Sequence, residues 1–174
     1  MTERTVTAYW LIPAKQERKL LHQIIRALCK KFDAPRFEAH LTLFVTSQDR
    51  RRSTEILRQI RSKPIRLKVR GIGLSSEFTK TLFIRFRPNK ALEQLTADLS
   101  RISKSRPKCV SDLHLSLLYK SMSISAQNEL ARSIELPFST VIFDSIKAVQ
   151  CASPTRNRAD VEAWRVLAAK SLAG

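Results

Sequence analysis

Long apolar runs and paired cysteines are both missing from this sequence. No segment approaches the roughly 20 consecutive apolar residues that a membrane-spanning helix needs, and the first apolar run is too short for a secretory leader. The three cysteines, Cys29, Cys109 and Cys151, are odd in number and form no CxxC motif. We therefore expect reduced thiols in a cytoplasmic protein that does not bind a membrane.

Acidic residues are also scarce. The chain has 15 Asp and Glu against 32 Lys and Arg, which gives a net charge of +17. A field of this sign attracts phosphate-rich partners, so we expect a nucleotide or nucleic acid ligand, with a solvated basic surface as the alternative. Part of the charge lies in segments 50–52 and 61–70, away from the motifs described below. The charge therefore indicates a class of ligand and locates no site.

Apolar periodicity predicts the secondary structure. Alternating or continuous apolar runs predict strands at 5–13, 35–46, 65–72, 81–88, 111–119, 138–150 and 161–169. Apolar positions three and four residues apart predict helices at 15–32, 53–61, 89–102 and 125–134. The polar segment 153–160 is expected to be a surface loop.

The order of these elements repeats. Strand, helix, histidine-bearing strand, helix and strand occur over 5–73 and again over 81–150, before a closing strand at 161–169. Pro13 precedes His40 by 27 residues, and Pro88 precedes His114 by 26. We interpret this pattern as an internal duplication within a single domain over 1–174, built as two intertwined lobes.

Two of the three histidines stand in the same frame: HLTLFV begins at His40 and HLSLLY begins at His114. Residues i and i+2 of a strand share a face, so His40 projects together with Thr42. By the same rule His114 projects together with Ser116. If a pseudo-twofold axis relates the halves, the two imidazole–hydroxyl pairs face one cleft from opposite sides. His22 falls on the polar side of the first predicted helix, and we expect it to be exposed.

Two imidazoles and two hydroxyl groups suit displacement at phosphorus. One histidine takes a proton from the nucleophile and the other gives one to the leaving oxygen. Thr42 and Ser116 would donate hydrogen bonds to the non-bridging oxygens. The arrangement requires no metal or cofactor, and neither frame has a second ligand at metal-binding spacing. A purely structural role for both histidines is the remaining alternative.

The two frames resemble the paired H-x-[ST]-x-apolar signature of the 2H phosphoesterase superfamily. The segments WLIP at 10–13, PRF at 35–37, HLSLLY at 114–119 and EAWRVLA at 162–168 are similar to the plant and microbial cyclic phosphodiesterase branch. The resemblance implies a catalytic pair, His40 and His114. It also implies substrate-binding residues, which are Thr42, Ser116, Tyr119, Trp10 and Phe78.

The resemblance further implies an α+β, bilobal, pseudo-twofold fold, with two antiparallel β-sheets facing a central cleft and helices on the outside. The implied reaction is metal-independent opening of ADP-ribose 1″,2″-cyclic phosphate or of nucleoside 2′,3′-cyclic phosphates by a monomer without a cofactor. We take His114 as the general base and His40 as the acid, although the pseudo-symmetry makes the reverse equally feasible.

The net charge exceeds what a small cyclic nucleotide substrate demands. An RNA-directed relative therefore stays open, acting as a 2′,5′ phosphodiesterase, as a ligase-like enzyme or on RNA ends. A non-catalytic RNA-binding module is the third hypothesis.

Overall fold

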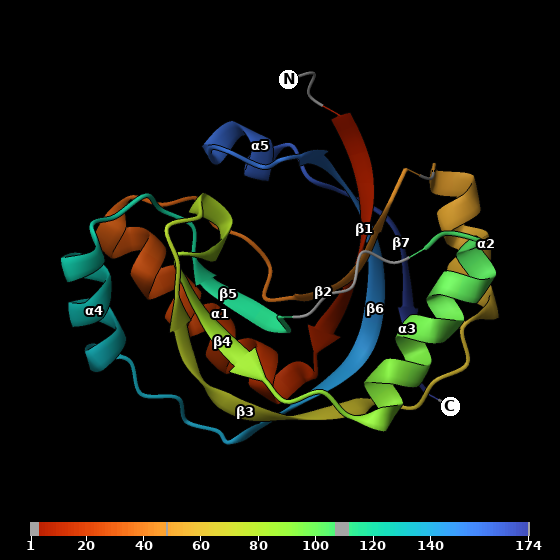
Figure 1. The fold of residues 1–174 in the computed structure, drawn as a ribbon, viewed down its shortest axis with the longest axis horizontal. Helices are drawn as coiled ribbons and strands as arrows, with labels where there is room; N and C mark the ends of the chain where they lie inside the picture. Colours follow the sequence, from red (N-terminus) through yellow and green to blue (C-terminus); the bar gives the residue numbers. More distant parts are fainter. Residues whose placement is uncertain (1–3, 48, 107–111, 174) are drawn as a thin grey trace.

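The computed structural model describes residues 4–47, 49–106 and 112–173 as a mixed α+β fold, which confirms the predicted class (Figure 1). The strands are β1 (Arg4–Pro13), β2 (Leu41–Thr46), β3 (Ile65–Leu74), β4 (Leu82–Phe86), β5 (His114–Leu118), β6 (Thr140–Ser153) and β7 (Arg165–Ser171). The helices are α1 (Lys15–Phe32), α2 (Arg50–Gln59), the 3₁₀ turn η1 (Phe78–Lys80), α3 (Lys90–Ser103), α4 (Ile124–Ser133) and α5 (Arg158–Glu162).

Capping side chains decide where two helices begin. The Asp49 side chain accepts a hydrogen bond from the backbone N–H of Arg52 at 2.9 Å, so α2 begins before the predicted residue 53. Asn157 and Asp160 form a capping box that opens α5 within the predicted surface loop. Because α5 occupies the chain up to residue 162, the last strand begins at Arg165, later than predicted.

The strands form one antiparallel seven-stranded sheet in the order β1-β2-β5-β4-β3-β6-β7, with an additional pairing of β1 with β6. The prediction of two separate sheets is corrected on this point. The histidine-bearing strands β2 and β5 are themselves neighbours, joined where Leu41 pairs with Leu115. The β1–β6 pairing then connects the first strand of the order back to the sixth.

The predicted repeat of element order is present in the described residues. If β1, β2 and β3 are exchanged with β4, β5 and β6, every neighbour pair among these six strands maps onto another neighbour pair. For example, β1–β2 becomes β4–β5, and β1–β6 becomes β4–β3. The topology is consistent with an internal duplication, which stays a prediction.

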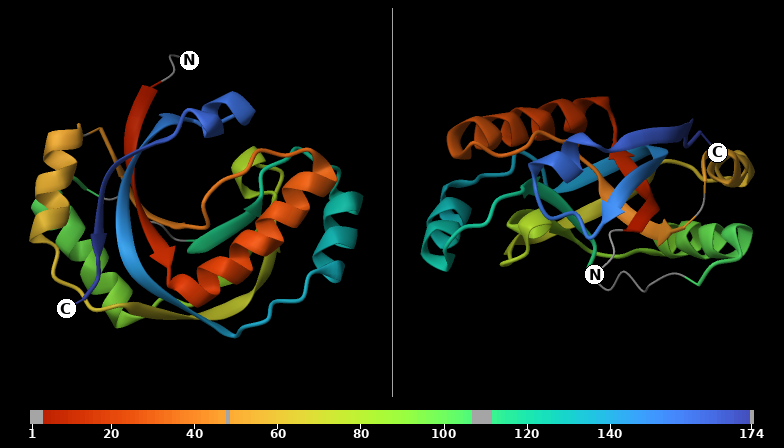
Figure 2. Two further views of the ribbon diagram at one scale, coloured as in Figure 1. Left: turned by 180° about the vertical axis from the view of Figure 1, so that it is seen from behind. Right: turned by 90° about the horizontal axis from the view of Figure 1, so that it is seen from above.

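The helices lie outside the sheet (Figures 1 and 2). α1 packs against β1 and β5, and α4 packs against β3. On the opposite side α2 contacts β7 and α3, and α3 contacts β2. Most of the core is a single apolar cluster between these layers, whose large fully buried members include Tyr9, Phe44 and Phe143. No helix formed by the described residues is long and apolar enough to span a membrane.

Candidate active site

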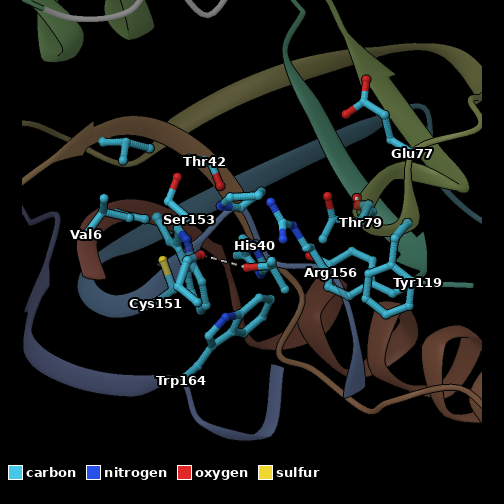
Figure 3. A pocket seen from close by; sticks show the side chains of 18 of the residues that line it. Val6, His40, Thr42, Glu77, Thr79, Tyr119, Cys151, Ser153, Arg156 and Trp164 are labelled. Carbon is cyan, nitrogen blue, oxygen red and sulfur yellow. Dashed lines mark hydrogen bonds between the residues drawn. The ribbon is translucent and has the colours of Figure 1, made fainter. Parts of the chain in front are cut away.

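One cavity of about 510 Å³ is lined by all of the residues that the sequence nominated (Figure 3). These residues are Trp10, His40, Thr42, Phe78, His114, Ser116 and Tyr119. They come from β1, the start of β2, η1, and β5 with the residue that follows it. The fold thus collects residues from both halves of the chain at one place.

The pairing of β2 with β5 sets the two frames side by side. Leu41 and Leu115 are opposite each other and fully buried, so their neighbours along each strand face the other side of the sheet. Continued by one residue in each direction, this register sets His40 opposite Ser116 and Thr42 opposite His114. The frames were expected on opposite walls of a cleft, and they lie on adjacent strands instead. Diagonal neighbours of this kind are separated by roughly 7–8 Å, which leaves room for a phosphate group between the imidazoles.

Both imidazoles are held by a backbone carbonyl group two residues earlier. His40 Nδ1 lies 2.6 Å from the carbonyl oxygen of Glu38, and His114 Nδ1 lies 2.8 Å from that of Asp112. A carbonyl oxygen only accepts, so Nδ1 carries the proton in both rings. Nε2 is then the unprotonated nitrogen of each neutral imidazole and is the atom available for proton transfer.

The residues that supply these carbonyl groups are acidic, and each is bound to a lysine. The Lys147 ammonium group donates to both carboxylate oxygens of Glu38 at 2.7 Å. The Lys80 ammonium group makes the equivalent ion pair with Asp112. The two halves of the chain therefore support their histidines in the same way.

His40 lies in aromatic surroundings. Its ring stacks on Trp10 with 3.7 Å between ring centroids and 13° between ring planes. Trp164 and Phe37 meet it edge-on at 5.8 and 6.3 Å. The residue is 7% exposed, and this burial lowers the pKa of its imidazole to about 4, with the His114 charge acting in the same direction. His40 is therefore neutral at pH 7.

His114 has more polar surroundings. It is half-buried, and the Phe83 ring meets it edge-on at 5.4 Å. Burial lowers its pKa and the Lys80 charge adds to this effect, whereas the Asp112 carbonyl group and the carboxylates of Asp112 and Glu77 raise it. Because these carboxylates favour the imidazolium form, His114 is the better placed of the two histidines to hold a proton.

The three predicted pocket aromatics differ in what they offer a ligand. Trp10 and Tyr119 are buried, and each has a ring face covered, by His40 and by Phe37 at 3.9 Å respectively. Phe78 is half-exposed at the cavity wall. The stacking role predicted for all three fits Phe78 better than the other two.

Several lining residues escaped the sequence analysis. Arg156 and Trp164 approach the cavity from around α5, where the polar segment gave only a surface-loop signal (Figure 3). Among the described residues that line the cavity, Arg156 and Glu77 carry the formal charges. Within the described part of the chain, no acceptor is within hydrogen-bonding distance of the buried Trp164 Nε1. The Ser116 hydroxyl donates to the Thr79 carbonyl oxygen at 2.7 Å, so it must turn to reach a ligand.

His22 does not match its prediction. It was expected to be exposed, and it is half-buried. Its Nε2 accepts a hydrogen bond from the backbone N–H of Ala39 at 3.1 Å. The third histidine is therefore attached to the chain segment that carries His40.

The cysteines do not supply a nucleophile. Cys29 and Cys151 are free thiols, and Cys109 lies outside the described residues. Cys151 lines the cavity, but burial raises the pKa of its thiol to about 11, so it stays protonated. Over 4–47, 49–106 and 112–173, no group of three or more His, Cys, Asp and Glu is arranged to hold a metal ion. Metal independence itself stays a prediction.

Known structures share this fold. E. coli LigT complexed with 3′-AMP aligns over 98% of this chain and 99% of its own, with 15% identity and a TM-score of 0.58. A structure described as a phosphoesterase aligns over 98% and 99% with 14% identity and a TM-score of 0.60. TT0787 of Thermus thermophilus aligns over 97% and 98% with 14% identity and a TM-score of 0.59.

The chain has the 2H phosphoesterase fold. No family model and no curated protein sequence matches it. At 14–15% identity the likeness establishes the fold, and with it the arrangement of strands that frames the 2H cavity.

Proposed function

We propose that the protein is a 2H phosphoesterase that opens cyclic phosphates by general acid–base catalysis. One observation carries the proposal: two imidazole–hydroxyl pairs on adjacent antiparallel strands line the same cavity. Both rings use Nδ1 for a backbone carbonyl group, which leaves two Nε2 atoms for the reaction. This is the set of groups that in-line displacement at phosphorus needs.

The electrostatics assign the two roles. His40 is neutral at pH 7, so its Nε2 takes a proton from water as the oxygen attacks phosphorus. The bond from phosphorus to one ring oxygen breaks, and protonated His114 gives its proton to that oxygen. The product is a phosphate monoester. These roles reverse the assignment made from the sequence, because burial under Trp10 disfavours a charged His40.

The remaining polar groups would stabilise the phosphate. Thr42 and Ser116 donate to the non-bridging oxygens once Ser116 turns away from the Thr79 carbonyl group. The Arg156 guanidinium group adds the positive charge that the cavity wall otherwise lacks. Trp164 Nε1 is a further donor for a ligand oxygen.

The substrate we propose is a small cyclic nucleotide, either ADP-ribose 1″,2″-cyclic phosphate or a nucleoside 2′,3′-cyclic phosphate. The cavity volume of about 510 Å³ is within the range for small-molecule sites. Structures of E. coli LigT with 3′-AMP, ATP and NADP+ show that this fold can hold nucleotides. We further propose a cytoplasmic monomer of the cyclic phosphodiesterase branch.

Turnover of cyclic phosphates in EDTA tests the proposal. We expect wild-type protein to open the ring with a bell-shaped pH profile. We expect His40→Ala and His114→Ala to lose at least about 100-fold in kcat, since each general catalyst is worth roughly 10²–10⁴-fold. Circular dichroism checks that both variants fold. Substantial turnover by either variant would overturn the acid–base mechanism.

An RNA-directed activity is the second candidate, and the net charge of +17 favours it. The cations gather outside the cavity, for example Lys15, Arg18, Lys19 and Arg26 on α1 and Arg50, Arg51 and Arg58 on α2. Short 2′,5′-linked RNA offered beside the cyclic nucleotides separates the two activities by their products. A non-catalytic RNA-binding module would instead bind RNA with a steep salt dependence that His40→Ala does not change.

A further inference from the structure

A single peptide group connects two of the three histidines. The peptide bond between Glu38 and Ala39 contributes the Glu38 carbonyl group and the Ala39 N–H. The carbonyl oxygen accepts from His40 Nδ1 at 2.6 Å, and the N–H donates to His22 Nε2 at 3.1 Å. The path from His22 to His40 is therefore one amide with both ends engaged.

This peptide group has little freedom to satisfy its ends elsewhere. Ala39 is fully buried, so its N–H has no access to water. The Glu38 side chain is tied to Lys147, which fixes the other side of the same residue. A buried N–H that loses its acceptor is costly, so removing the His22 imidazole favours rotation of the peptide plane. Rotation of that plane also moves the carbonyl oxygen that holds the His40 ring.

We propose that His22 is a positioning residue, whose neutral Nε2 orients the Glu38–Ala39 peptide group and through it the ring and tautomer of His40. The effect on catalysis rests on the proposed function, whereas the effect on the His40 tautomer does not. Hydrogen bonds in series also polarise one another, so the His22 contact strengthens the carbonyl group as an acceptor for His40.

The proposal requires His22 to be neutral. A protonated imidazole carries hydrogen on both nitrogens and would set Nε2–H against the Ala39 N–H. Burial lowers the pKa of His22, and Arg18, Arg26 and Lys147 act in the same direction, whereas the Glu38 carboxylate raises it. Arg36 lines the same hollow, and Lys15 and Lys19 line the adjoining one. The basic face of α1 thus helps to keep this contact formed near neutral pH.

Two substitutions separate positioning from packing. In His22→Gln the side-chain carbonyl oxygen can accept from the Ala39 N–H and does not titrate. In His22→Leu the volume remains and the acceptor is lost. Gln23→Leu, at an exposed position on the same helix, is the matched control for an apolar substitution on α1. Urea unfolding of each variant checks that the fold is retained.

The first measurement is independent of any enzymatic activity. Nitrogen-15 NMR of the imidazoles reports the tautomer of each histidine near pH 8, and single-histidine variants assign the signals. We expect His22, His40 and His114 all to carry the proton on Nδ1. We expect His40 to keep that tautomer in His22→Gln and to become a mixture in His22→Leu. An Nε2–H tautomer for His22, or an unchanged His40 in His22→Leu, overturns the proposal.

The second measurement is kinetic. We expect His22→Leu to lower kcat roughly 10- to 100-fold with little change in KM, as a displaced catalytic group does. We expect His22→Gln and Gln23→Leu to stay near wild type at pH 8. Below pH 6.5 the wild-type rate should fall in step with protonation of His22, and His22→Gln should lack that step. Equal losses in His22→Leu and His22→Gln, with the His40 tautomer intact, would assign His22 a packing role and refute positioning.

Discussion

The burial of His40 predicts a specific loss of stability in acid. The pKa of this imidazole falls from 6.5 to about 4 on folding. The folded state thus favours the neutral ring, so the contribution to the free energy of unfolding is complete above pH 6.5 and is lost as the pH falls toward 4. Such a difference in pKa corresponds to roughly 3 kcal/mol at pH 4.

His40→Asn isolates this contribution. The asparagine amide can donate to the Glu38 carbonyl oxygen in place of Nδ1 and does not titrate. Urea unfolding at pH 7 and pH 4 gives the free energy of unfolding of both proteins. We expect wild type to lose about 3 kcal/mol more than the variant between these pH values. His114→Asn is the control, and its effect should be smaller because His114 is only half-buried.

The comparison has a clear refuting result. Any difference in packing between wild type and His40→Asn is present at both pH values, so it is subtracted out. If both proteins lose the same free energy from pH 7 to pH 4, within about 1 kcal/mol, the ring under Trp10 is not desolvated as the structure shows. The assignment of His40 as the base would then lose its physical reason.

Two further predictions concern the surroundings of His114. A Cβ at Gly73 would lie 2.3 Å from the Phe83 ring, so Gly73→Ala must displace a ring that contacts His114; we expect about 1–3 kcal/mol of destabilisation and lower kcat, and unchanged urea midpoint and kcat would contradict this. Asp112→Asn removes a carboxylate that raises the pKa of His114 and leaves Lys80 unpaired, so we expect NMR titration to show a lower His114 pKa, whereas a constant or higher value would count against the assigned cause.

Local pattern was sufficient to predict the secondary structure and the identity of the central residues. The 3.6-residue period of α1 and the two-residue period that pairs His40 with Thr42 depend only on neighbours along the chain. Both α2 and α5 carry capping signals at Asp49 and Asn157, which could have corrected their predicted bounds. The predicted cavity residues share one site because each is attached to an element that could be recognised locally.

Contacts between distant segments were decided by the tertiary structure alone. The pairing of Leu41 with Leu115 sets the two frames on adjacent strands, and no local period contains that register. Stacking on Trp10 makes His40 the neutral histidine, which reverses the catalytic roles that symmetry had left open. The bond from Ala39 to His22 likewise joins residues 17 apart. Burial and charge at a site are sums over neighbours in space, so only the folded chain could set them.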